Sequence, residues 1–270
     1  MRAGFVIGKA NGLHNKAGGF ARKAVCYAIC LLAALLPATF AQADQILAVG
    51  AEFAHIFERS KDGQFSGLGV DLVRTLAHQR GDTVRFEIYP WGRAQWMVET
   101  GQAQILIGPY KTGDREKRFT FAARPFYRDD LVFLARGSDR INWNGDFSDI
   151  GKHPVGIILG WTYGPRFERA SDTFRLEVAN TLSAGLAMLS AGRIDLLASN
   201  RRNTEDYMRR NPGFQGYVML NPPIGALDGY LAYCKKQCDA IRLDYDALSD
   251  TAAVRAVLNA QAASYHLNLP

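Results

Sequence analysis

Residues 104–115 read QILIGPYKTGDR, an apolar segment that fits a buried strand followed by a glycine-rich turn. In open α/β folds, ligands bind at the loops that follow the carboxyl ends of the strands. The turn carries Arg115, and the planar fork of donors on a guanidinium matches a carboxylate. Taken alone, Arg115 fits equally well into the solvated charged run at 114–118.

Strands and helices alternate on both sides of this stretch, which is typical of a largely parallel sheet. Alternation and helical periodicity predict these elements: strands at 45–50, 84–88 and 104–108, helices at 68–79 and 93–100, and a long apolar strand at 131–135. Gly81 is placed to end the helix at 68–79. One lobe is complete at this point.

A polar stretch with turn signals at 137–152 introduces a second alternating set. Its predicted elements are strands at 155–159, 174–178 and 194–198 and helices at 165–170 and 182–191. The remaining strand, 230–233, and helices, 241–248 and 252–263, are too few for a third domain and should complete the first lobe.

We therefore predict an α/β fold with two lobes, residues 44–136 plus 224–270 and residues 137–223. Each lobe should hold a mostly parallel sheet flanked by helices. Two hinge strands, near 134–137 and 223–226, should join the lobes and leave a cleft between them.

The first 43 residues have the pattern of a secretory signal peptide. They contain five basic residues and no acidic one, then an apolar run at 24–37 and the ending Ala41-Gln42-Ala43. That run is shorter than the roughly 20 residues of a membrane-spanning helix. Cleavage would leave 27 of the 32 basic residues against all 26 acidic ones, so the basic character of the whole chain does not indicate a nucleic-acid partner.

Catalytic, cofactor and metal motifs are missing from the sequence. The mature histidines are scattered without metal-ligand spacing, and there is no HExxH, GxSxG or Walker motif. We expect no cofactor and no catalytic residue. In an oxidising compartment, Cys234 and Cys238 are a candidate disulfide pair.

The order of motifs resembles the bacterial extracellular solute-binding proteins of family 3, which serve polar amino acid ABC transporters. The segments that carry the resemblance are DGQFSGLGVDL at 62–72, PWGRA at 90–94, TGDR at 112–115 and GRID at 192–195. The match spans nearly all of 46–267. It implies a type II-like periplasmic binding protein fold.

The resemblance also implies which residues of the first lobe bind the ligand. Arg115 matches the arginine that grips a ligand carboxylate, and Gly108 and Tyr110 occupy the adjoining loop positions. Phe53 and Trp91 are candidate aromatic walls, with ordinary core packing as the alternative.

In the second lobe, the segment at 160–162 matches a loop before a helix, whose free amides can bind an anion. Thr162 would add a hydroxyl there, and Trp161 would narrow the pocket. Asn200 stands where amino-acid binders of the family carry an aspartate that pairs with the α-ammonium. Arg201 and Arg202 follow it, either as partners of a second acidic group or as a solvated helix start.

The resemblance implies a monomeric, non-catalytic periplasmic receptor that closes around a small polar solute with a carboxylate, an amino acid or a related acid. An inner-membrane ABC permease would be its partner. Two alternatives have the same sequence features: a stand-alone ligand sensor, and an enzyme similar to the periplasmic cyclohexadienyl dehydratases, in which a carboxylate in the cleft assists the reaction.

Overall fold

The computed structural model describes residues 45–270, so the expected signal peptide at 1–43 lies outside the described residues. The first part of the described chain contains β1 (Gln45–Gly50), β2 (Glu58–Arg59), β3 (Phe65–Ser66), α2 (Leu68–Arg80), β4 (Thr83–Ile88), α3 (Trp91–Glu99), β5 (Ile105–Tyr110), α4 (Gly113–Arg118), β6 (Thr120–Phe121) and β7 (Tyr127–Arg136). The second alternating set and the return contain β8 (Pro154–Ile158), α5 (Pro165–Ala170), β9 (Arg175–Ala179), α6 (Leu182–Ser190), β10 (Leu196–Asn200), α7 (Arg201–Arg210), β11 (Tyr217–Met219), β12 (Gly225–Tyr233), α8 (Asp239–Ser249) and α9 (Ala252–Ser264).

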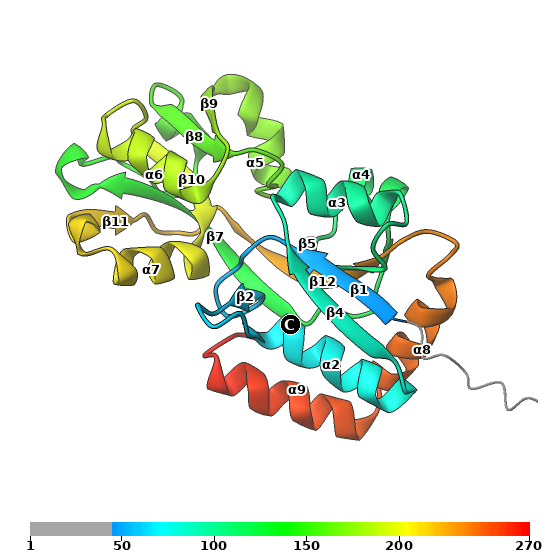
Figure 1. Cartoon of the computed structure of the whole chain (residues 1–270). Coiled ribbons are helices and arrows are strands. Elements are labelled where there is room, and N and C mark those ends of the chain that lie inside the picture. The colour runs from blue at the N-terminus through cyan, green and yellow to red at the C-terminus, as the bar shows by residue number, and fades with distance from the viewer. Residues whose placement is uncertain (1–44) are drawn as a thin grey trace, which may run out of the picture. The chain divides into compact units, whose positions relative to one another are not determined.

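The strands form the two parallel sets that the alternation predicted. In the first lobe β1 pairs in parallel with β4 and β5, and in the second β8 pairs in parallel with β9 and β10. Both sets belong to one mixed sheet with the order β4-β1-β5-β12-β7-β10-β8-β9, because β12 and β7 pair antiparallel between them (Figure 1). The predicted α/β fold is confirmed.

Strands β7 and β12 pass between the two lobes and change partners on the way. Residues 127–131 of β7 pair with 225–229 of β12. Beyond Leu131, β7 pairs with β10, and beyond Gly229, β12 pairs with β5. The crossing therefore lies at 127–131 and 225–229, so the expected hinge at 134–137 was placed too late, because the end of β7 is already part of the second lobe's sheet.

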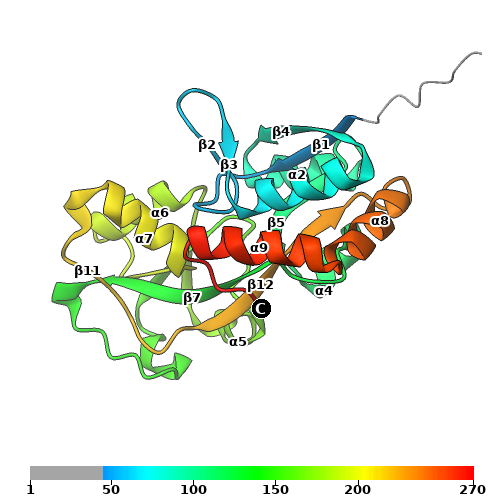
Figure 2. The ribbon, with the colours of Figure 1, turned by 90° about the horizontal axis from the view of Figure 1, so that it is seen from below.

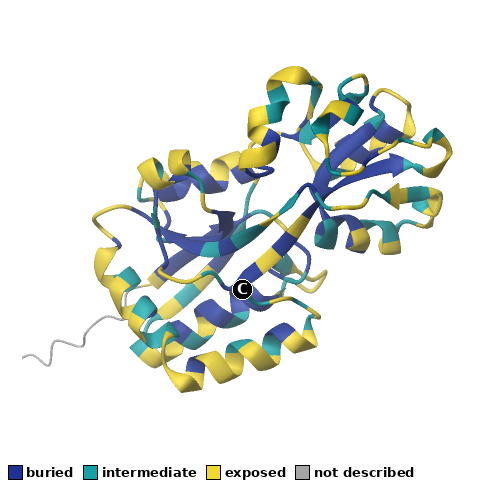
Figure 3. Cartoon of the chain, turned by 180° about the vertical axis from the view of Figure 1, so that it is seen from behind, coloured by how far each residue is buried: buried dark blue, intermediate teal, exposed yellow. Residues whose placement is uncertain are grey.

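Helices cover the sheet with their apolar sides inward. Helix α2 buries six apolar side chains between Leu68 and Ala77, and Gly81 ends it in the left-handed conformation with a φ of 85°. Helices α8 and α9 pack against α2, and Figure 2 shows α9 running beside it. Figure 3 shows that the strands of both lobes are mostly buried, while exposed residues gather on the outer helix faces.

Several short elements carry no clear pattern in the sequence. The turn expected after β5 is helix α4, which begins at Thr112, whose hydroxyl accepts a hydrogen bond from the Arg115 amide (3.2 Å). Helix α7 has the sequence RRNTEDYMRR and shows no apolar stripe, so helical periodicity did not reveal it. Helix starts at such places depend on the capping residue.

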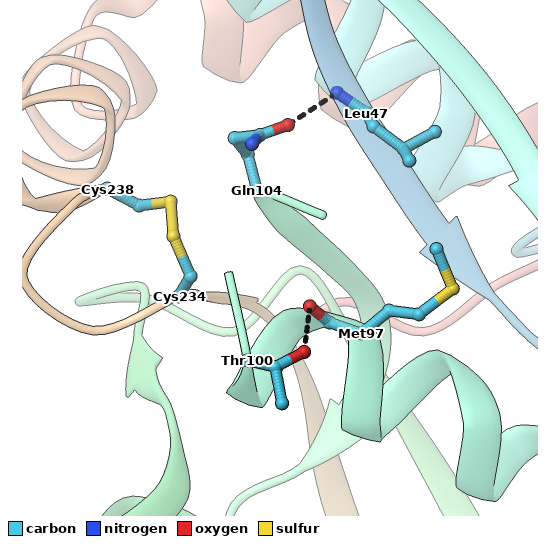
Figure 4. Close-up of a disulfide and its surroundings, with 6 residues drawn as sticks. All are labelled: Leu47, Met97, Thr100, Gln104, Cys234 and Cys238. Carbon is cyan, nitrogen blue, oxygen red and sulfur yellow. Dashed lines mark hydrogen bonds between the residues drawn. A yellow bond between two sulfur atoms is a disulfide. The ribbon is translucent and has the colours of Figure 1, made fainter. Parts of the chain in front are cut away.

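A disulfide joins Cys234 at the end of β12 to Cys238 before α8. Figure 4 shows it near Gln104, whose side-chain oxygen accepts a hydrogen bond from the Leu47 amide (2.9 Å). The Gln104 carbonyl also accepts from the Cys234 amide (3.2 Å). Gln104 thus connects β1 to the disulfide loop.

Within residues 45–270, no helix combines the length and the apolar character needed to cross a bilayer. The same residues contain no group of three or more His, Cys, Asp or Glu side chains arranged to hold a metal ion.

Candidate ligand-binding site

All eight residues proposed from the sequence line one cavity, which we call the inner cavity. Its walls are Phe53, Trp91, Gly108, Tyr110, Arg115, Tyr127, Trp161, Thr162, Asn200 and Arg202. Most of them lie at the carboxyl ends of β1, β4, β5, β8 and β10 or in the segments that follow, which is where α/β sheets bind ligands, whereas Tyr127 is the first residue of β7. The inner cavity has a volume of about 20 Å³, room for about one water molecule.

Arg115 is buried, unlike the charged residues around it. Its side chain is carried by α4, and the residue is 7% exposed. The guanidinium donates to the Tyr110 carbonyl (2.8 Å) and, across the cleft, to the Gly160 carbonyl (2.9 Å). No carboxylate of residues 45–270 forms an ion pair with it, and burial lowers the pKa of Arg115. The solvated-run interpretation of Arg115 is therefore wrong, and this buried cation has no carboxylate in direct contact, although the charge of Glu168 acts on it from farther away.

Aromatic rings surround this guanidinium. Phe53 meets Trp91 and Trp161 edge to face, with ring centroids 5.4 and 6.2 Å apart. The Trp91 indole donates to the Gly160 carbonyl (3.1 Å), and the guanidinium of Arg115 lies 5.6 Å from the Trp91 ring centroid. These rings pack with one another and also line the inner cavity.

Gly108 has a backbone conformation that other residues rarely adopt, with a φ of 86°. A Cβ there would lie 3.2 Å from the Tyr127 hydroxyl. That hydroxyl donates to the Gly108 carbonyl (2.7 Å). The close approach of Tyr127 to this turn therefore depends on glycine.

In the loop before α5, two of the groups that could bind an anion are already bonded within the protein. The Thr162 hydroxyl donates to Glu168 of the same segment (2.7 Å), and the Tyr163 amide donates to the same oxygen (3.3 Å). Glu168 thus already occupies this helix start. Thr162 and Trp161 still line the inner cavity.

Asn200 begins α7 as its capping residue. It is 3% exposed, and its side-chain oxygen accepts a hydrogen bond from the Asn203 amide (2.9 Å). A neutral side chain that is needed for a helix start explains Asn200 without any ligand.

The sequence reasoning missed a buried ion pair next to the inner cavity. Arg202 donates to both oxygens of Asp129, from Nε (2.9 Å) and Nη2 (2.6 Å), and the Tyr110 hydroxyl donates to Asp129 as well (2.6 Å). Burial alone would lower the pKa of Arg202, but the neighbouring Asp129 raises this pKa above its usual value. Burial and the charge of Asp129 both raise the pKa of Tyr110. Arg202 is therefore not part of a solvated helix start.

The alternation of buried and exposed residues along β7 could have revealed that Asp129 is buried. Its residues 127–131 are buried and exposed in turn, which places Asp129 on the buried face with Tyr127 and Leu131. Arg201, in contrast, faces outward and pairs with Asp130 (3.5 Å).

Hydrogen bonds across the cleft hold the two lobes together around the inner cavity. Arg202 donates to the Ala54 carbonyl, and the Ala54 amide donates to Asn203 (2.9 Å). Arg210 of α7 pairs with Glu58 of β2 (2.9 Å). The described structure is thus a closed arrangement.

A second hollow, the outer groove, lies on the other side of Arg115 and Trp161. Its volume is about 780 Å³, and it is lined mainly by residues of α4, by the segment 160–165 and by Glu168 and Arg169. Arg115, Trp161 and Thr162 line both hollows, so the inner cavity lies next to a groove of ligand size.

Known structures with this fold include binding proteins and a sensor domain. "The crystal structure of Tv2483 bound to L-arginine" matches with a TM-score of 0.70 and 12% identity over 83% of this chain and 92% of that one. A histidine kinase sensor domain similar to periplasmic binding proteins matches with a TM-score of 0.73 and 18% identity over 84% and 98% of the two chains. At these identities, the likeness shows the fold alone.

A curated relative and a family model give closer information. A protein described as a probable histidine-binding protein, from Neisseria gonorrhoeae, is 24% identical over 206 residues, 75% of each chain. Residues 47–184 match the model of the bacterial extracellular solute-binding proteins, family 3. The chain belongs to the bacterial extracellular solute-binding proteins of family 3.

Proposed function

We propose that this chain is a monomeric periplasmic receptor that closes around a small carboxylate-bearing solute, an amino acid or a related acid, and delivers it to an inner-membrane ABC permease. The membership of an extracellular solute-binding family and the curated histidine-binding relative support this proposal. The expected signal peptide at 1–43 would deliver the chain to the periplasm.

The observation that carries the proposal is the state of Arg115. The hydrogen-bond partners of this buried guanidinium are backbone carbonyls, so no carboxylate is paired with it directly, which is costly in a protein interior. A ligand carboxylate would supply the countercharge and accept two parallel hydrogen bonds. To do so it would displace the Gly160 carbonyl from Arg115.

The lobes must separate for a solute to reach this position, because the inner cavity holds about one water molecule. We propose that the lobes, expected at 44–136 plus 224–270 and at 137–223, turn about the crossing at 127–131 and 225–229, so that residues 132–136 of β7 move with the second lobe. Opening would break the contacts of Gly160 with Trp91 and Arg115 and of Ala54 with α7.

The dehydratase alternative needs a carboxylate in the cleft. Of the residues that line the inner cavity within the described chain, none is Asp or Glu. The carboxylates that such an enzyme could use, Asp114, Glu116 and Glu168, line the outer groove instead.

The test is a thermal-shift screen of the purified protein against amino acids and simple carboxylates. A solute at 100 times its Kd should stabilise the protein by about 2.7 kcal/mol, or about 5–10 °C for a chain of this size. Arg115→Met should abolish the shift without lowering the Tm of the free protein, whereas the exposed control Arg175→Met should retain it. If Arg115→Met showed the same ligand-induced rise in Tm as the wild type, Arg115 would not be the residue that binds the carboxylate.

A further inference from the structure

The wall of the inner cavity carries positive charge and, among the described residues, no negative charge. Arg115 and Arg202 are its two charged members. Asp129 balances Arg202, but Arg115 has no such partner. The side chains of the wall, counted together with Asp129, therefore carry one positive charge in excess, which a single carboxylate would balance; Glu168 is bonded to Thr162 and does not itself line the cavity.

Asp129 does not reach the inner cavity itself. Tyr110 and Arg202 both line the cavity and both donate to Asp129, so they stand between its carboxylate and a bound solute. An ammonium group in the cavity would meet the guanidinium of Arg202 before it met Asp129. Like charges placed together in this way oppose binding.

Three oxygen acceptors in or beside the cavity wall already have donors, of which the third, on Gly160, belongs to the outer groove. The Asn200 side chain caps α7, and the Gly108 carbonyl accepts from Tyr127. The Gly160 carbonyl accepts from both Trp91 and Arg115. An ammonium has three N–H donors and would have to share these occupied acceptors.

The aromatic rings offer an apolar surface rather than a free ammonium cage. The guanidinium of Arg115 lies 5.6 Å from the ring centroid of Trp91, and that of Arg202 lies 5.3 Å from that of Tyr127. Those two rings already face cations. Phe53 and Trp161 remain to pack against the body of a solute.

From this juxtaposition we infer that the inner cavity selects an aryl monocarboxylate without an α-ammonium group. Its carboxylate pairs with Arg115, and its ring packs against Phe53 and Trp161. The inference rests on the proposed function, because it concerns the solute of the same receptor. Of the two solute classes proposed there, amino acids and related acids, it selects the related acids.

The experiment compares 3-phenylpropanoate with L-phenylalanine, which differ only by the ammonium group, by isothermal titration calorimetry on the purified protein. We expect 3-phenylpropanoate to bind at least about tenfold more tightly, since the wall opposes a cation. Equal or tighter binding of phenylalanine would overturn the inference.

The variant Asn200→Asp places a carboxylate in the wall and keeps the helix cap, because Asp caps a helix as well as Asn does. It should shift the ratio of the two affinities toward phenylalanine by at least about tenfold. Asn259→Asp, the same change on the exposed side of α9, should leave the ratio as it is. An unchanged ratio in Asn200→Asp would show that wall charge does not decide selection, against the inference.

Failure of the inference and failure of the proposed function give different results. If amino acids bind more tightly than their deaminated analogues and Arg115→Met abolishes that binding, the receptor stands and the inference falls. If neither 3-phenylpropanoate nor phenylalanine binds and no carboxylate in the wider screen does, both fall.

Discussion

Breaking the ion pair between Asp129 and Arg202 should destabilise the protein more than any loss of an exposed ion pair. Asp129 is 3% exposed and the Arg202 side chain 9%, and three donated hydrogen bonds converge on the carboxylate. Removing one partner of such a pair leaves a buried charge uncompensated and costs about 3–5 kcal/mol. For Asp129→Ala this corresponds to a fall in Tm of about 6–20 °C.

Replacing both partners should cost less than the two single changes together. In Arg202→Met combined with Asp129→Ala, no charge remains buried, and apolar replacements of whole buried pairs are often close to neutral. We expect a coupling of about 2–3 kcal/mol between the two positions. Urea unfolding of the wild type, both single variants and the double variant measures it.

The matched control lies one residue away on the same strand. Arg128 pairs with Asp228 across β7 and β12 (2.6 Å), but both side chains are partly exposed. Asp228→Ala should therefore have a much smaller effect than Asp129→Ala. Additive effects at Asp129 and Arg202, or losses no larger than that of Asp228→Ala, would show that the buried pair does not contribute more than an exposed one.

Two further predictions concern a glycine and the disulfide of the first lobe. A Cβ at Gly229 would lie 1.9 Å from the Tyr127 ring, so Gly229→Ala should lower the unfolding free energy by about 1–3 kcal/mol. Gly225 lies on the same strand with open space around it, so Gly225→Ala should not lower it. Equal Tm values for the two variants would contradict this prediction. Replacing Cys234 and Cys238 together by Ala should lower the unfolding free energy by about 2 kcal/mol, because the disulfide closes a short loop. The solute affinity should stay unchanged. A loss of affinity in calorimetry would show that the loop affects the site.

The fold was predictable because apolar runs and turns alternate regularly along the chain. The continuous sheet was not, because pairing between β7 and β12 joins residues about a hundred positions apart. Helix α7 was anticipated only as one of two interpretations of Arg201 and Arg202, since its ten residues are almost all polar. Its start depends on the capping of Asn200, which the sequence alone does not distinguish from a ligand contact.

A residue of the candidate site was predictable where its position in a turn decides the direction in which its side chain points. Arg115 follows a buried strand by five residues and therefore reaches the carboxyl end of the sheet. Arg202 gave no such signal, because its partner Asp129 lies 73 residues away. The local bond from Thr162 to Glu168 was also missed, since helix-start residues and ligand-binding residues have the same composition.

The most direct test of the account is a crystal structure with the carboxylate that gives the largest thermal shift. We expect both carboxylate oxygens about 2.7–2.9 Å from the guanidinium nitrogens of Arg115, with the Gly160 carbonyl released and the solute ring against Phe53. A solute bound in the outer groove alone, with Arg115 still donating to Gly160, would contradict it.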